Sequence, residues 1–498
     1  MSQRMVTSKN KPQKYWIVLL VLPLMLLLFN AGIVTAESAK HYTDLEFAPP
    51  PEIVLPPFER FELENGMVVY LMEDRELPLV SGTALIRTGD RLEPANQTGL
   101  GQILGQVLRT GGTTLHSPDE LNQLLEQRAA SVETTIDTTS ASASFNALSQ
   151  DLEEVFGLFA EVLRTPAFAP EQIELAQRQQ AGAIARRNDS PSAIASREFQ
   201  KLIYGENSPY ARSIEYETLS NISRSDVVQF YQRYFHPNNM ILGIVGDFET
   251  PQMRALIQQK FGDWKPDKTV SPNIAALSPT AQAKQGGVFL VERPQLTQST
   301  IQIGHLGGEL NSPDYPALSV LNGVLNGFGG RLFKQVRSRE GLTYSVYGVW
   351  SPRYDYPGMF IAGGQTRSEA TVPFIQSVFR EIERIRREPI TAEELQYAKD
   401  TTLNSFIFNF ADPSQTLSRL MRYEYYGYPE DFIFQYRRGV EATTIEDVQR
   451  VAQKYLNPDQ LVTLVVGNPM EINPPLSSLT PDTSVTSIDI TIPEPSRS

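Results

Sequence analysis

Two glutamines, Gln102 and Gln106, stand one helical turn apart in the stretch "TGLGQILGQVLRTGG" (98–112). Side chains at i and i+4 lie on the same face of a helix, which is the spacing that two metal ligands on one helix use. A glycine lies directly before each of them, Gly101 and Gly105, although a glycine inside a helix costs about 1 kcal/mol relative to alanine. This combination indicates a functional site, either in working order or degenerate.

The helix that must position these glutamines is predicted to be amphipathic. Its apolar residues recur with the spacing of one buried stripe and are Leu100, Ile103, Leu104, Val107 and Leu108. A second helix is predicted shortly after it, with Ser117 as N-cap, Pro118 at the first helical position and Glu120 as the partner in a capping box.

Length and composition limit the class of protein. A chain of 498 residues is long enough for two or three domains. Its net charge of −13 argues against a nucleic-acid-binding protein, which needs a basic surface to neutralise phosphates. The chain has no cysteine, so neither disulfides nor thiolate metal sites are expected.

The N-terminus predicts export. Basic residues precede the 15-residue apolar run 15–29, and the small residues of "VTA" (34–36) supply a cleavage site, so residues 1–36 are interpreted as a signal peptide. The alternative is an uncleaved membrane anchor formed by residues 15–29. We expect the rest of the chain to be periplasmic or extracellular in either case, with contact to a membrane only if the segment is uncleaved.

An internal repeat organises the remainder. The segment 226–248 matches 447–469, 221 residues later, and 166–177 matches 388–399 at an offset of 222. A repeat of this length indicates two duplicated domains rather than a solenoid. Because strand and helix patterns alternate in both halves, we predict an α+β fold with two homologous domains. Each is expected to be a largely antiparallel sheet with helices packed on one face.

The predicted boundaries follow composition and the repeat. They are a Pro-rich lead at 37–57, an N-terminal domain at 58–264, a linker at 265–287, a C-terminal domain at 288–470 and a disordered tail at 471–498.

The stretch "GLGQILGQVLRTGGT" (99–113) resembles the zinc motif of the pitrilysin, or inverted zincin, family, which includes insulysin and the mitochondrial processing peptidase. The family has two zinc-binding histidines and a general-base glutamate in the pattern H-x-x-E-H. The resemblance puts Gln102 and Gln106 at the histidine positions, Gly105 at the glutamate, and Ala183 at the third zinc ligand, a glutamate about 80 residues on. All four site residues therefore differ from the family pattern.

Such a set of residues does not make a catalytic zinc site, which needs three strong N, O or S donors. Two amide oxygens are weak donors, alanine offers none, and glycine cannot move a proton. The four histidines are scattered singly, at His41, His116, His236 and His305, and a metal pair of His305 with Glu309 has no helical pattern to support it. We expect no metal cofactor in this chain.

The second half contains "GFGGRLFKQVRSREGLTYSVYGVW" (327–350), which resembles the family's substrate-binding segment. The resemblance makes Arg337 and Tyr344 the arginine and tyrosine that reach the bound peptide. Arg337 is predicted in the last turn of a helix and Tyr344 at the start of a strand, so both can point to one place. A guanidinium donates forked hydrogen bonds to carbonyls, and a tyrosine hydroxyl can donate to an oxyanion. The alternative is that Arg337 pairs with Glu340 or another carboxylate and that Tyr344 is a half-buried strand aromatic.

A chain without the zinc motif but with this pair resembles one subunit of a two-subunit enzyme. The sequence is interpreted as the non-catalytic, substrate-binding subunit of a zinc endopeptidase heterodimer that acts on peptides or unfolded segments. A homologous partner with H-x-x-E-H would supply the zinc. The alternatives are a structural or binding scaffold with no role in proteolysis and, third, a peptidase with an unrecognised site.

Overall fold

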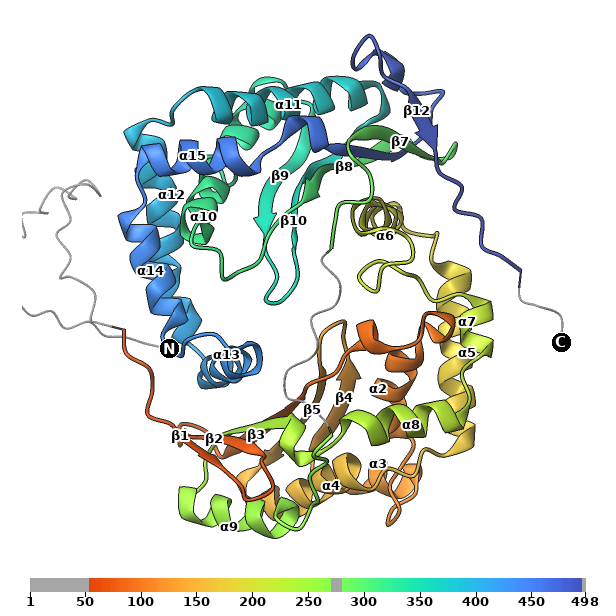
Figure 1. Ribbon diagram of the computed structural model, residues 1–498, viewed down its shortest axis with the longest axis vertical. Coiled ribbons are helices and arrows are strands. Elements are labelled where there is room, and N and C mark those ends of the chain that lie inside the picture. Colours follow the sequence, from red (N-terminus) through yellow and green to blue (C-terminus); the bar gives the residue numbers. More distant parts are fainter. Residues whose placement is uncertain (1–52, 270–279, 495–498) are drawn as a thin grey trace, which may run out of the picture. The chain divides into compact units, whose positions relative to one another are not determined.

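Each half of the repeat forms a six-stranded sheet in the computed structural model, which describes residues 53–269 and 280–494 (Figure 1). All the elements below belong to the compact unit Leu55–Ser498. The strands of the first sheet are β1 (Glu59–Glu62), β2 (Val68–Glu73), β3 (Leu79–Ile86), β4 (Ser131–Ile136), β5 (Ala141–Leu148) and β6 (Met240–Gly246). Those of the second sheet are β7 (Gly287–Glu292), β8 (Gln298–Leu306), β9 (Thr343–Ser351), β10 (Met359–Arg367), β11 (Val462–Gly467) and β12 (Val485–Ser487).

The two sheets share one plan. The first has the order β1-β2-β6-β3-β5-β4 and the second β12-β7-β11-β8-β10-β9. Only β2–β6 is parallel in the first sheet, and β7–β11 and β7–β12 are parallel in the second. The largely antiparallel α+β fold with two homologous domains is therefore confirmed.

Helices accompany each sheet. Those of the first half are α2 (Leu100–Thr110), α3 (Pro118–Glu126), α4 (Leu152–Arg164), α5 (Pro170–Arg186), α6 (Pro191–Tyr204), α7 (Tyr216–Ser220), α8 (Arg224–Tyr234) and α9 (Thr250–Phe261). Those of the second half are α10 (Tyr315–Leu325), α11 (Thr371–Arg387), α12 (Ala392–Asn404), α13 (Pro413–Tyr426), α14 (Phe432–Ala442) and α15 (Ile445–Tyr455). The matched segments of the repeat correspond to α8–β6 and α15–β11.

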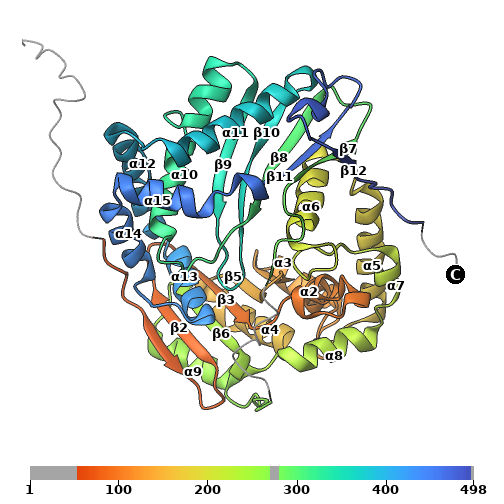
Figure 2. The same cartoon turned by 45° about the horizontal axis from the view of Figure 1, so that its top comes forward.

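Each half also lends one helix to the other. Alternate residues of β2, β3 and β6 face two different apolar clusters, and the second cluster contains Leu417, Leu420 and Met421 of α13. In the same way, α6 packs against β8 and β11 of the second sheet, with Phe199 fully buried there (Figure 2). The expectation of helices on one face is thus incomplete, because the other face of each sheet is covered by a helix from the opposite half.

The tail prediction is wrong for residues 471–494. Ile472 and Leu476 are buried in the second core, and β12 pairs in parallel with β7. Farther on, Ile490 accepts a hydrogen bond from the Asn188 side chain at 2.7 Å, and Ile492 packs on the first core. A few apolar side chains are enough to order this Pro/Ser/Thr-rich segment, because they pack on a sheet edge and on two cores that are already formed.

Several predicted segments lie outside the described residues. They are the signal peptide 1–36 with its alternative anchor 15–29, most of the Pro-rich lead 37–57, and part of the linker 265–287. Within 53–269 and 280–494, no helix has both the length and the apolar character needed to cross a membrane.

Candidate functional site

Helix α2 has the predicted stripe. Its five apolar side chains are each no more than 2% exposed and pack in the first core. The helix begins after Gly99, which has a φ of 110°, a backbone conformation that glycine adopts without strain. The capping box of Ser117 with Glu120 is also confirmed, at the N-terminus of α3.

The two glycines of α2 are explained by close packing, of Gly105 on β4 and of Gly101 on Asp90. A Cβ at Gly105 would lie 2.6 Å from the backbone nitrogen of Ile136, and one at Gly101 would lie 3.0 Å from the Cβ of Asp90. Thr134 of β4 donates a hydrogen bond to the carbonyl oxygen of Gly105 at 2.6 Å. The helix and the strand are so close that the glutamate position of the motif has no room for any side chain.

The glutamines border a cavity of about 510 Å³ between α2, β4 and α5. Gln102 is exposed, and Gln106 donates a hydrogen bond to Gln179 of α5 at 2.5 Å. Gln180 also lines this cavity, whereas Ala183 is exposed on α5 and does not line it. Sequence reasoning missed Gln179 and Gln180, although the run "QRQQ" just before Ala183 could have indicated them.

Two acidic residues at the start of α2 were also missed. Glu93 is buried and accepts hydrogen bonds from the backbone N–H groups of Gly101 and Gly99 at 2.8 and 3.0 Å. Burial raises the pKa of Glu93 to about 7, and these two hydrogen bonds offset the rise only in part. Burial likewise raises the pKa of Asp90, which lines the cavity, to about 6.

The histidines within the described residues have ordinary roles. His116 lies 2.8 Å from Glu161, and His236 lies 2.6 Å from the carbonyl oxygen of Gln232. His305 is 2% exposed, and burial lowers its pKa. Its Nδ1 donates to the Leu306 carbonyl at 2.8 Å, and its Nε2 accepts a hydrogen bond from the backbone N–H of Asn457 at 3.4 Å. His41 lies outside the described residues.

The structure brings Arg337 and Tyr344 together. Arg337 lies in a π-helix (Phe333–Arg339), and its guanidinium carbon is 4.7 Å from the centre of the Tyr344 ring and 4.5 Å from that of Phe333. Short π-helical segments occur often at functional sites. Glu340 pairs instead with Arg380 at 2.8 Å, so the alternative Arg337–Glu340 pair is not formed. In the part of the chain that the structure describes, no carboxylate forms an ion pair with Arg337.

A β-bulge directs Tyr344. Thr343 pairs with Thr366 and Ser345 with Gln365, which leaves Tyr344 as the extra residue between two consecutive partners. A bulge bends its strand and re-aims the side chain there. Tyr344 is accordingly 82% exposed rather than half-buried, and its ring lies over the guanidinium of Arg337.

Known proteins share both the sequence pattern and this fold. Residues 69–215 match the model of the insulinase family (peptidase family M16), and residues 221–402 match that of the peptidase M16 inactive domain. The non-peptidase homologue YmxG of Helicobacter pylori is 23% identical over 80% of this chain and 89% of its own length. The uncharacterised zinc protease YmxG of Bacillus subtilis is 20% identical over 82% of this chain and 98% of its own length.

Solved structures agree. The peptidase M16 inactive domain from Pseudomonas fluorescens is 26% identical, with a TM-score of 0.73 over 83% of this chain and 98% of that one. The periplasmic protease PqqL of Escherichia coli is 17% identical, with a TM-score of 0.69 over 90% of this chain and 50% of that one. The chain belongs to peptidase family M16. The predicted family resemblance is confirmed.

The residues predicted to stand at the family's zinc positions do not fit the metal. Gln102 and Gln106 offer only amide groups, one of them bonded to Gln179, and Ala183 offers no donor. A general base at Gly105 is excluded by the backbone of β4. Among residues 53–269 and 280–494, no group of three or more His, Cys, Asp or Glu side chains is placed to hold a metal ion.

Proposed function

We propose that this chain is the non-catalytic, substrate-binding subunit of an exported zinc endopeptidase heterodimer. The observation that carries the proposal is the Arg337–Tyr344 pair. A bulge and a π-helix present it at the surface, and no carboxylate of the described chain neutralises it. A half-buried guanidinium beside an exposed phenol can donate to peptide carbonyls and to an oxygen that becomes negative during cleavage.

The length relationship to PqqL supports a partner. This chain covers 50% of that periplasmic protease, and we propose that a second chain supplies the remainder of an equivalent assembly. We propose that this partner is a homologous H-x-x-E-H subunit that brings the zinc and the general base. The predicted signal peptide supports a location in the periplasm or outside the cell.

The first test is purification of the full-length chain from its native host, followed by peptidase assays of each chain alone and of both together. We expect an H-x-x-E-H homologue to co-purify and cleavage to require both chains. Tyr344→Phe should lower kcat by about 10²–10³-fold, the effect of removing one oxyanion donor. Arg337→Ala should lower it as well.

Matched controls are Arg339→Ala, from the same π-helix, and Tyr347→Phe, from the same strand. Both should leave cleavage within about twofold of the unaltered pair. If the two-chain complex cleaves peptides and the Arg337 and Tyr344 variants leave the rate unchanged, the chain is a scaffold. Zinc and cleavage from this chain alone would refute the proposal.

A further inference from the structure

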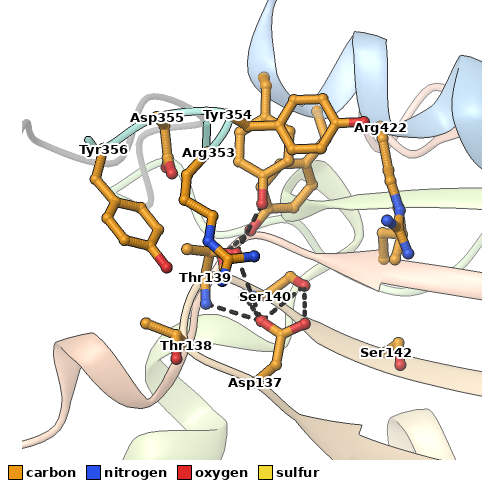
Figure 3. A pocket seen from close by; sticks show the side chains of 13 residues that line it. Asp137, Thr138, Thr139, Ser140, Ser142, Arg353, Tyr354, Asp355, Tyr356 and Arg422 are labelled. Carbon is orange, nitrogen blue, oxygen red and sulfur yellow. Dashed lines mark hydrogen bonds between the residues drawn. The ribbon is translucent and has the colours of Figure 1, made fainter. Parts of the chain in front are cut away.

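A second cavity, of about 370 Å³, lies where three segments of the chain meet (Figure 3). One segment is the β4–β5 turn with the start of β5, which contributes hydroxyl side chains, the second is the β9–β10 loop 353–356, and the third is α13. The repeat does not explain it, because the turn belongs to the first half and the other two segments belong to the second.

The walls of this cavity, which we call the carboxylate pocket, are held in place by ring stacking and hydrogen bonds. The rings of Tyr354 and Tyr426 stack at 4.6 Å with an interplanar angle of 6°. The hydroxyls of Tyr426 and Tyr425 bond to Thr139 of the turn, at 2.7 Å to its Oγ1 and at 2.6 Å to its carbonyl oxygen. The loop, the helix and the turn therefore keep their places without a ligand.

The two acidic side chains of the pocket are already engaged. Asp137 accepts hydrogen bonds from the backbone N–H groups of Thr139 and Ser140, both at 2.8 Å. Asp355 pairs at 2.7 Å with Arg91, whose side chain is 3% exposed. Burial raises the pKa of Tyr426 to about 12, so this phenol stays neutral at physiological pH.

Two guanidinium groups of the pocket are not engaged in this way. Arg353 comes from the loop and Arg422 from α13, and Figure 3 shows both side chains directed towards the hydroxyl-lined floor that includes Ser142. Neither arginine forms an ion pair with any carboxylate of residues 53–269 or 280–494. Arg91 lies outside the lining but pairs with Asp355, which leaves the pocket with two lining arginines against one remaining carboxylate, that of Asp137. One negative charge would balance it.

The pocket adjoins the cavity beside Gln102 and Gln106. Asp137 and Thr138, which follow directly after β4, line both. A ligand chain lying in the glutamine-lined cavity can therefore extend past the end of β4 and place a group between the two arginines.

We propose that this pocket binds a carboxylate group of a peptide between Arg353 and Arg422. The inference rests on the proposed function, because it takes the bound molecule to be a peptide. A guanidinium presents paired N–H donors that match the two oxygens of a carboxylate, and two such groups from separate walls favour an anion over a neutral amide. The carboxylate belongs to an Asp or Glu side chain or to the C-terminus of the peptide.

The test measures binding of fluorescent ten-residue peptides to the purified full-length chain by anisotropy. One peptide carries a single Glu, its isostere carries Gln, and each is made with a free and with an amidated C-terminus. We expect at least a tenfold preference for a carboxylate-bearing peptide, weakening as salt increases. Loss of the preference on Glu→Gln identifies a side chain, and loss on amidation identifies the C-terminus.

The double variant Arg353→Gln/Arg422→Gln should abolish this preference, while Arg178→Gln on the exposed face of α5 should keep it. Equal binding of all four peptides would overturn the inference and leave the proposed function standing. This comparison uses only the unaltered chain, so it does not depend on the folding of any variant. A preference that survives the double substitution would place the site elsewhere. If inorganic phosphate binds to the chain but displaces none of the peptides, the pocket is a site for small anions. If no peptide binds at all, the proposed function fails as well.

Discussion

The two regions predicted to correspond to the family's reactive groups differ in how much space the fold leaves around them. In the first half, β4 lies so close to α2 that a Cβ at Gly105 would meet backbone at 2.6 Å. In the second half, a bulge directs Tyr344 away from its sheet, so that it is 82% exposed above Arg337. The position without a reactive side chain, Gly105, is closed by packing, whereas the Arg337–Tyr344 pair depends on two irregular backbone segments. Irregular segments of this kind indicate a functional constraint.

The first long helix of each half shows the same divergence in its charges. Glu93 caps the start of α2 in a buried position where its pKa is about 7. Asp314 occupies the N-cap position of α10. Burial alone would raise its pKa, but hydrogen bonds from Lys454, Arg450 and Tyr455 outweigh burial and lower it to about 2. An acidic group near the start of the helix thus has a raised pKa in the first half and a lowered pKa in the second.

The largest effect on stability is expected at the exchanged helices. Phe199→Ala in α6 should destabilise the protein by about 3–5 kcal/mol, because it empties a fully buried site, and Leu417→Ala in α13 by about 2–5 kcal/mol. Hydrogen exchange should show β8 and β11 of the second half loosened by the α6 substitution. Denaturant unfolding measures the size of the effect.

Leu175→Ala is the control for this experiment, since Leu175 is 38% exposed on α5 and its loss should cost under about 1 kcal/mol. Faster exchange confined to the first-half strands would contradict the packing of α6 on the second sheet.

A smaller effect should separate two helical glycines of the first half. Gly105→Ala should destabilise by about 1–3 kcal/mol because the added methyl meets backbone. Gly182→Ala should stabilise by up to about 1 kcal/mol, since its nearest neighbour atom would be 3.8 Å away and alanine is the better helix former. Thermal unfolding of both variants decides it. Equal shifts in Tm would show that α2 is farther from β4 than described.

The two caps should give opposite pH dependences. For Glu93, whose pKa rises from 4.5 to about 7, the stabilisation is present below pH 4.5 and is lost as the pH rises through about 7. For Asp314, whose pKa falls from 3.8 to about 2, the stabilisation is present above pH 3.8 and is lost as the pH falls through about 2. Denaturant unfolding between pH 2 and pH 8 tests both. Glu93→Gln should reduce the change in unfolding free energy with pH near neutrality, and Asp314→Asn should reduce the change at acid pH. If either substitution leaves its part of the pH dependence unchanged, the pKa assigned to that residue is refuted.

The smallest effect on stability is expected at the Arg337–Tyr344 pair. Tyr344→Phe should change the free energy of unfolding by less than about 0.5 kcal/mol, because its hydroxyl is at the surface. Arg337→Ala should remove a cation–π contact worth about 0.5–1 kcal/mol. Measurement of Tm for the same variants that enter the two-chain cleavage assay separates a structural role of the pair from a substrate-binding role. A large loss of Tm would make the pair structural instead of substrate-binding.

Local features of the chain were predictable because they depend on residues within one or two turns of each other. The apolar stripe of α2 follows from a period of 3.6, and the Ser117–Glu120 box from side chains that reach neighbouring backbone groups. The duplication followed from direct matching of the halves. The nearness of Arg337 to Tyr344 followed from a helix end and a strand start seven residues apart.

The fold alone decided the features that join distant segments. An apolar helix face must be buried, but hydrophobic burial is not directional, so the sequence of α6 or α13 does not say which sheet receives it. The closeness of α2 to β4, the bulge at Tyr344 and the addition of β12 to the second sheet depend on strand register and on partners up to two hundred residues away. The carboxylate pocket joins three such segments, which is why its arginines were not recognised until the tertiary structure brought them together.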